Sequence, residues 1–298
     1  MKYLAGAGAA AAALLALSTA AAAEPIHRRT IGTSLLDDLD LFAQYSAAAY
    51  CSANLDSTGS ALACSVGNCP LVEAADTTIL YDFDETNDYG DTAGYIAVDT
   101  TNGYIILTFR GSDSLENWIA DLTFKLIDAS DICSGCEVHD GFWKSWETVA
   151  DDITSQIESA VETYPDYTLI ATGHSLGAAL AAIAATVLRL DGYTVELYNY
   201  GQPRIGNLAL ADYITSESMG TNYRVTHTDD IVPKVPPELL GYAHFSPEYW
   251  ITSGNDVTVT DADVNEVVGV DSTAGNDGTT DDSVEAHRWY FVHISACS

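Results

Sequence analysis

The sequence predicts an α/β fold in which a mostly parallel sheet is flanked by helices. Short β-branched or apolar runs of strand length recur along the middle of the chain, and helical stretches fall between some of them. This alternation is typical of a parallel sheet covered by helices. Hydrophobic residues make up 47% of the 298 positions, so the chain can bury a sizeable core. We find no internal repeat and no proline-rich linker, and we therefore expect one domain.

The predicted elements follow in order along the chain. We expect strands at 104–109, 167–172, 195–200 and 223–227. Helical periodicity predicts a helix over 146–164 that ends before Pro165, and an apolar run predicts a second helix over 178–190. The second run is shorter than the roughly 18 residues that a membrane span requires, so we expect a buried helix under the sheet. Residues 252–286 are rich in Gly, Asp, Asn, Thr and Ser and predict irregular surface structure with a short strand or two.

The N-terminus has the pattern of a processed, exported protein. Residues 1–23 begin with a positive charge, continue as an Ala/Leu-rich run and end in small residues, which is typical of a secretory signal peptide rather than a membrane anchor. Residues 24–29 end in two arginines and indicate a propeptide with a dibasic cleavage site. The mature domain is then expected to span 30–298, to be extracellular and to contain no integral membrane segment.

The charge balance limits the choice of partners. The chain carries 11 basic and 43 acidic residues, a formal net charge of −32. Phosphate groups would be repelled, so we expect no nucleic-acid partner. The acidic run at 261–265 resembles the start of a calcium loop, but Glu266 stands where glycine is required and Ser272 where glutamate is required. We therefore expect no metal site and no cofactor.

Six cysteines agree with secretion. An even number in an exported chain predicts three disulfides, although spacing alone does not choose among the possible pairings. The C-S-G-C run at 133–136 is interpreted as a local clasp rather than a redox motif.

The motif G-H-S-L-G at 173–177 carries the strongest chemical signal. A strand runs directly into it and a helix leaves it, so Ser175 lies at a strained turn with its hydroxyl exposed above the sheet edge. The flanking glycines allow close approach of neighbouring backbone. The start of the helix favours developing negative charge. We interpret this as the nucleophile elbow of an α/β hydrolase.

Ser175 needs a histidine base, and the base needs an orienting acid. In this fold the chain order is Ser, Asp or Glu, His, which leaves His227, His244, His287 and His293 as candidates. His287 is best placed because it follows a flexible acidic loop. We expect structural roles for His174 and His139.

Asp229 and Asp230 are the candidate acids. Both follow a strand-like run, at the position where catalytic acids of this fold occur, and position alone separates them poorly. For the oxyanion hole we expect the N–H of Leu176 and a second donor from Ser112, which follows the strand 104–109, although a simple turn there is equally compatible with the residues.

Residues 113–124 place Leu115, Trp118, Ile119 and Leu122 at near-helical spacing beside acidic residues. A core-facing helix would have this pattern. Because the segment directly follows the expected oxyanion donor, we favour a short amphipathic lid with its apolar side over the site.

The runs FRGSDSLENWIADL, DICSGCEVHDGF, YPDYTLIATGHSLG, RVTHTDDIVPKVPP, GYAHFSPEYW and AHRWYF together resemble the filamentous-fungal class 3 lipases. The similarity extends from Phe42 to Cys297. It implies a triad of Ser175, Asp230 and His287, so Asp230 is preferred over Asp229. It also implies oxyanion roles for Ser112 and Leu176 and a lid over 115–119 with Trp118 on its apolar face.

The resemblance further implies the disulfides Cys51–Cys297, Cys64–Cys69 and Cys133–Cys136. The chain departs from the family pattern at Ala178, where a third glycine is expected, and at Asp113, where a basic residue is expected. It is also more acidic than the family pattern.

These features predict a secreted enzyme that hydrolyses triacylglycerol at a lipid–water interface, which it contacts transiently and peripherally. The alternative is an esterase for soluble esters such as feruloyl esters, but the Leu-x-x-Trp-Ile lid pattern is more apolar than such an enzyme needs. A degenerate hydrolase that only binds should lack a triad member, and none is missing.

Overall fold

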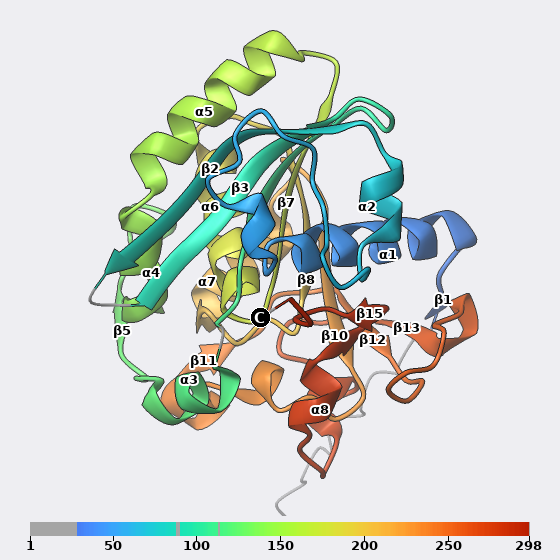
Figure 1. Cartoon of the computed structure of the whole chain (residues 1–298). Coiled ribbons are helices and arrows are strands. Elements are labelled where there is room, and N and C mark those ends of the chain that lie inside the picture. Colours follow the sequence, from blue (N-terminus) through green and yellow to red (C-terminus); the bar gives the residue numbers. More distant parts are fainter. Residues whose placement is uncertain (1–28, 88–89, 113, 298) are drawn as a thin grey trace, which may run out of the picture.

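The computed structural model describes residues 29–87, 90–112 and 114–297 (Figure 1). Its centre is a nine-stranded sheet with the strand order β1-β13-β12-β10-β8-β7-β4-β3-β2. The strands of this sheet are β1 (Arg29–Thr30), β2 (Thr77–Asn87), β3 (Gly90–Asp99), β4 (Tyr104–Phe109), β7 (Thr168–His174), β8 (Val195–Tyr200), β10 (Asn222–His227), β12 (Glu248–Ile251) and β13 (Val264–Val267). The inner pairs β4–β7, β7–β8, β8–β10 and β10–β12 are parallel, and the outer pairs are antiparallel. The prediction of a mostly parallel sheet is therefore confirmed.

The long hairpin formed by β2 and β3 is an element that the sequence analysis did not predict. Acidic residues interrupt β2, and small residues make up much of β3, so neither run has a clear strand pattern. Gly94 shows why a small residue is required in β3. A Cβ there would lie 2.0 Å from the carbonyl oxygen of Thr108 and 2.7 Å from the ring of Phe83.

Helices cover both faces of the sheet (Figure 1). On one face lie α1 (Thr33–Ala48) and α2 (Pro70–Ala74), and on the other lie α4 (Asp140–Glu147), α5 (Ala150–Thr163) and α6 (Leu176–Leu190). The remaining helices are α3 (Leu115–Asp121), α7 (Leu208–Ser216) and α8 (Val284–His287). None of the helices in the described residues is long and apolar enough to cross a membrane.

The single helix predicted over 146–164 is wrong, because two helices occupy this region. α4 ends at Glu147 and α5 begins at Ala150. The Thr148 hydroxyl donates to the carbonyl of Ser145 at 2.7 Å, and Val149 N–H donates to the carbonyl of Trp146 at 3.0 Å. These two bonds satisfy carbonyls at the end of α4, and the chain then starts α5 with acidic residues in its first turn, which complement the helix dipole.

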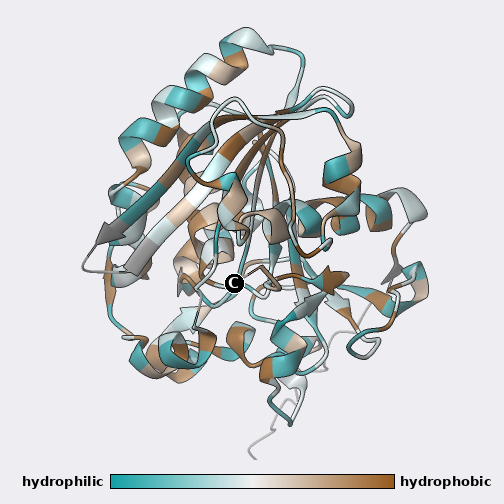
Figure 2. Cartoon of the chain, viewed as in Figure 1, coloured by the Kyte–Doolittle hydropathy of each residue, from teal (hydrophilic) through white to brown (hydrophobic). Residues whose placement is uncertain are grey.

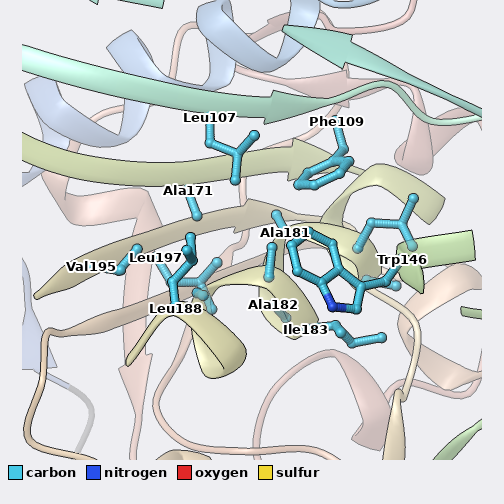
Figure 3. Close-up of a cluster of buried hydrophobic side chains, with 14 of the residues drawn as sticks. Leu107, Phe109, Trp146, Ala171, Ala181, Ala182, Ile183, Leu188, Val195 and Leu197 are labelled. Atoms are coloured by element: carbon cyan, nitrogen blue, oxygen red, sulfur yellow. The ribbon is translucent and has the colours of Figure 1, made fainter. Parts of the chain in front are cut away.

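α6 is the buried helix that the apolar run predicted, and it begins two residues earlier than expected. Every residue except Val187 and Leu190 is buried. Its alanines and leucines pack against side chains of β4, β7 and β8, and Trp146 of α4 belongs to the same buried cluster (Figure 3). The two polar side chains in this apolar helix have hydrogen-bond partners. The Thr186 hydroxyl donates to the carbonyl of Ala182, and the Arg189 guanidinium donates to the carbonyl of Val195 and to the side chain of Asn222.

Two smaller sheets complete the fold. The first, in the order β11-β9-β6-β5, contains β5 (Leu126–Asp128), β6 (Glu137–His139), β9 (Gly206–Asn207) and β11 (Tyr242–Ala243). The second pairs β14 (Trp289–Tyr290) with β15 (Val292–His293). Residues 252–286 are mostly irregular, with the short strand β13 and isolated 3-10 turns, as predicted.

The three disulfides join Cys51 to Cys297, Cys64 to Cys69 and Cys133 to Cys136, which are the pairings that the family resemblance implied. The first joins residues 246 positions apart. The predicted signal peptide and residues 24–28 lie outside the described residues. Arg29, where the predicted propeptide ends, pairs with Glu266 in the edge of the main sheet.

Candidate active site

Ser175 lies at the turn between β7 and α6, and its backbone has the strained geometry that the motif predicted. Its φ and ψ are 60° and −126°, in a region that non-glycine residues rarely adopt. A hydrogen bond from its own N–H to the carbonyl of Tyr200, at 3.0 Å, holds the turn. A Cβ on Gly173 would lie 2.4 Å from the carbonyl oxygen of Gly177, and one on Gly177 would lie 2.2 Å from that of Phe109. Both glycines are therefore needed for the close contact of strand and helix.

Asp230 and His287 meet although 57 residues separate them in sequence. Asp230 follows β10, and His287 is the last residue of the short helix α8. His287 Nδ1 lies 2.8 Å from Asp230 Oδ2, and both side chains are buried. When Nδ1–H donates to this carboxylate, Nε2 is the acceptor nitrogen of that tautomer.

Two further donors hold the Asp230 carboxylate. Val232 N–H donates to Oδ1 at 2.8 Å, and the Tyr290 hydroxyl donates to Oδ2 at 2.5 Å. Burial, together with the nearby Asp230 charge, raises the pKa of Tyr290 well above its ordinary value, so this phenol stays protonated and remains a donor. The acidic group is thus fixed from three directions.

Gly201 makes room for the His–Asp pair. It follows β8 with a φ of +58°, and a Cβ there would lie 2.8 Å from the His287 ring and 3.1 Å from Asp230 Oδ2. The sequence analysis singled out neither Gly201 nor Tyr290. The aromatic block after His287 is the only local signal that could have pointed to Tyr290.

Ser175 and His287 line one cavity of about 330 Å³. Within the described residues, neither Ser175 Oγ nor His287 Nε2 has a hydrogen-bond partner, although both atoms are buried. The structure therefore brings the predicted nucleophile and base to the same space without a direct bond between them. Buried polar atoms that face a cavity and lack partners are available to a ligand.

The two expected oxyanion residues lie beside Ser175. Ser112 lines the cavity, and Leu176 opens α6 directly after the nucleophile. Gly111 allows the end of β4 to approach, because a Cβ there would lie 3.0 Å from the Cβ of Ser175 and 2.0 Å from the Tyr50 hydroxyl oxygen. Ala178, where the family pattern has glycine, is fully buried in α6.

α3 contributes one side chain to the cavity, and its other apolar side chains pack elsewhere. Leu115 is buried and lines the cavity, Trp118 and Leu122 pack against the core, and Ile119 is partly buried. Figure 2 shows the hydrophilic and hydrophobic residues that alternate around this short helix. Glu116, on its outer side, accepts a hydrogen bond from Arg288 at 2.7 Å. Asp113, the unusual residue before the helix, lies outside the described residues.

The other candidate bases have structural partners. His227 contacts the carbonyls of Ala286 and Ser253 at 2.9 and 2.8 Å. His244 Nε2 contacts the carbonyl of Pro233 at 2.7 Å, and burial with two nearby arginines lowers its pKa well below the ordinary value. His293 Nε2 lies 2.7 Å from Asp256 Oδ1 at the surface, but His293 also lines the cavity, a position that the sequence did not indicate.

His174 and His139 have the structural roles that the sequence predicted. His174 Nδ1 lies 2.7 Å from the Tyr50 hydroxyl, and its Nε2 lies 2.8 Å from the backbone carbonyl of His287. Burial, followed by the neighbouring His287, lowers the pKa of His174 well below its ordinary value. His139 caps α4 by accepting from Phe142 N–H, and its other nitrogen contacts the carbonyl of Thr123, just after α3.

The described residues contain no group of three or more His, Cys, Asp or Glu side chains that could hold a metal ion.

Comparison with known proteins connects this geometry to a family. A family model described as lipase (class 3) matches residues 106–240, and one described as the lipase 3 N-terminal region matches residues 8–81. The chain is 49% identical over 278 residues to the secreted mono- and diacylglycerol lipase A of Penicillium cyclopium, with 91% of this chain and 89% of the relative covered. It is 37% identical to the secreted mono- and diacylglycerol lipase 1 of Fusarium solani, covering 90% of this chain and 80% of that relative.

Solved structures agree. A mono- and diacylglycerol lipase from Aspergillus oryzae superposes with a TM-score of 0.84 at 43% identity, covering 90% of this chain and all of that one. A lipase from Rhizopus microsporus var. chinensis superposes with a TM-score of 0.80 at 30% identity, covering 90% of this chain and 91% of that one.

Proposed function

Because the chain belongs to the class 3 lipase family, we propose that it hydrolyses acylglycerol esters with Ser175 as nucleophile, His287 as base and Asp230 as the acid that orients the base. The observation that carries this proposal is the buried His287–Asp230 pair, 2.8 Å apart, at the cavity where the strained Ser175 lies. Membership of this family makes the protein a lipase, that is, a carboxylic-ester hydrolase with an α/β-hydrolase fold.

The proposed reaction has two steps. Ser175 Oγ attacks the ester carbonyl while His287 Nε2 takes its proton, and the imidazolium that forms is stabilised by Asp230. His287 then gives this proton to the leaving alcohol. Water, activated by the same nitrogen, cleaves the acyl-enzyme in the second step. The N–H groups of Leu176 and Ser112 stabilise the oxyanion in both steps. No cofactor takes part.

Substrate class follows from the cover and from the relatives. Leu115 of α3 lines the cavity, so a lipid surface that binds α3 and draws it aside would open the site, which supports action on emulsified triacylglycerol. The relatives named as mono- and diacylglycerol lipases support a preference for partial glycerides within the same reaction. A soluble-ester esterase has less support because apolar Leu115 lines the cavity, and Trp118 and Leu122 add further apolar side chains to the same segment.

We also place the enzyme outside the cell. The relatives are named as secreted, and the three disulfides of the structure are typical of oxidising compartments. The lipid surface is then a transient, peripheral partner. The high negative charge makes anionic surfaces poor docking sites.

The test is the initial rate against tributyrin concentration, carried through the solubility limit, with Ser175→Ala as the blank. A sharp rise when emulsion forms supports a lipase whose cover opens at the interface. Simple saturation below the limit, with no rise beyond it, would favour the soluble-ester esterase. Equal rates for the blank and the parent would show that Ser175 is not the nucleophile.

A further inference from the structure

We propose that the segment 292–297, here called the C-terminal strap, is the wall that the alcohol part of the ester contacts, and that His293 and Ser295 select esters with free glycerol hydroxyls. The proposal rests on the function proposed above and adds a basis for choosing among acylglycerols. His293, Ser295 and Ala296 of the strap all line the cavity that contains Ser175.

The direction of the bound ester follows from the chemistry of the site. The leaving alkoxide must accept its proton from His287 Nε2, so the alcohol part lies on the His287 side of Ser175. The carbonyl oxygen points instead toward Ser112 and Leu176. Arg288 and the strap residues come from the chain that follows His287, and they supply the cavity wall next to the base. The strap therefore meets the glycerol part of an acylglycerol.

The polar groups of this wall suit hydroxyls better than hydrocarbon. The His293 side chain is 59% exposed, which places it at the mouth of the cavity, and its Nε2 lies 2.7 Å from Asp256 Oδ1. With Nε2–H donating to Asp256, Nδ1 can accept from a substrate hydroxyl. The Ser295 hydroxyl oxygen has two lone pairs and can accept from a substrate hydroxyl in addition to the contact that Ser295 makes within the protein. A third acyl chain against the exposed His293 ring would remove this ring from water without offering a hydrogen bond, which is unfavourable.

The strap is held firmly enough to discriminate. Ile294 N–H donates to the carbonyl of Arg288 at 3.1 Å, and Asn68 donates to the carbonyl of His293 at 2.9 Å. Cys297, one residue after the lining residue Ala296, is bonded to Cys51. Tyr50, one residue before Cys51, lines the cavity as well, so this disulfide fastens two walls together. Selection among similar substrates requires polar groups that are fixed in this way.

The experiment compares kcat/KM for monobutyrin, dibutyrin and tributyrin, all below their solubility limits so that no interface contributes. The variants are His293→Leu, Ser295→Ala and the double variant. Loss of one hydrogen bond corresponds to roughly a three- to tenfold change in rate. We therefore expect each single variant to lose about that factor on monobutyrin and dibutyrin, while the rate on tributyrin stays the same or rises, because a polar group that disfavours the third acyl chain is gone. His293→Gln and Ser295→Thr, which keep hydrogen-bonding groups, should restore much of the preference.

The controls separate the possible failures. Ser216→Ala removes an exposed hydroxyl that does not line the cavity and should leave all three rates unchanged. Thermal midpoints equal to that of the parent show that the strap still folds. A uniform loss on all three esters, or an unchanged ratio, would overturn the role of the strap while the proposed function stands. Tributyrin hydrolysis that survives Ser175→Ala would overturn the proposed function and the strap proposal with it.

Discussion

The floor of the site and its cover are built from two helices of opposite character. In α6, which carries the nucleophile at its start, every residue except Val187 and Leu190 is buried. In α3, the helix that we propose as the cover, Leu115 alone is buried. Burying a large apolar side chain contributes about 1.5–3 kcal/mol, so moving α6 would disrupt the core while moving α3 gives up only a few such contacts. The comparison shows that α6 is held far more tightly than α3, as the proposed opening of α3 requires.

The polar contacts of the site also differ between its buried side and the proposed cover α3. On the side of the catalytic pair, Asp230 accepts three hydrogen bonds, all from buried partners. The cover is joined to the rim of the cavity by the ion pair of Glu116 with Arg288, whose side chains are 60% and 40% exposed. Exposed ion pairs contribute about 0–1 kcal/mol, so this contact can hold the cover without locking it.

The largest effect is expected from Asp230→Asn, on the rigid side of the site. The amide cannot accept from His287 Nδ1–H and from both other donors as the carboxylate does, so the imidazole loses its tautomer and its stabilising charge. We expect kcat on tributyrin to fall about 10⁴-fold with the fold retained. Asp229→Asn, at the neighbouring partly buried position, is the matched control and should stay within about twofold of the parent, since a lost exposed contact contributes little. A loss below tenfold in Asp230→Asn would mean that another acid orients the base.

Gly177→Ala tests whether the floor can adjust. The new Cβ would lie 2.2 Å from the Phe109 carbonyl oxygen and 2.8 Å from Arg110 C, which are backbone atoms that cannot rotate away. We expect the free energy of unfolding to fall by about 3 kcal/mol or more, measured by urea unfolding. Gly32→Ala is the control, because a Cβ there meets nothing within 4 Å. If both variants unfold alike, the rigidity of the floor has been overestimated.

Tyr290→Phe removes one donor from Asp230 and keeps the packing of the ring. A hydrogen bond to a charged group contributes about 1.5–3 kcal/mol, and we expect a decrease of that size in the free energy of unfolding. Because the acid is then held less firmly, kcat should fall roughly tenfold, which corresponds to about 1.4 kcal/mol of the activation barrier. Stopped-flow rates and urea unfolding on the same samples measure both effects. An unchanged kcat would show that His287 and Val232 suffice to position Asp230.

The smallest effect is expected at the cover, from Glu116→Gln. Loss of the ion pair with Arg288 should favour the open state by at most about 1 kcal/mol, so the rate on dissolved tributyrin should rise by up to about fivefold. Added NaCl should raise the parent's rate in the same direction and leave the variant's rate unchanged.

Glu285→Gln is the matched control for the cover. Glu285 pairs with the same arginine at 2.7 Å but lies on α8 beside the base, not on α3. Its loss should leave the rate on dissolved tributyrin unchanged. If the rate on dissolved tributyrin rises equally in both variants, the change in Arg288 is responsible and the contact between α3 and Arg288 is not.

The predictable part of the site is local in the chain. The strand, the turn at Ser175 and the helix after it are adjacent in sequence, so one short pattern indicated all three. The order of strands and helices indicated the parallel sheet in the same way. The break at Thr148 and Val149 was missed because apolar residues keep helical spacing on both sides of it, and periodicity does not register the two hydrogen bonds that end α4. The β2–β3 hairpin was missed because its strands are acidic or small and are stabilised by pairing with each other and with β4.

The sequence by itself determined the nucleophile turn, the α/β class and, through its resemblance to the class 3 lipases, the pairing of the cysteines and the choice of Asp230. Residues alone left four histidines and two aspartates open, since their chemistry is the same at each position. The resemblance also implied that His287 pairs with Asp230. Only the tertiary structure decided that Gly201 and Tyr290 complete that contact and that the strap near Cys297 lines the cavity. The physical reason is that contacts between side chains far apart in the chain depend on how strands and loops pack together, and local sequence patterns do not predict that packing.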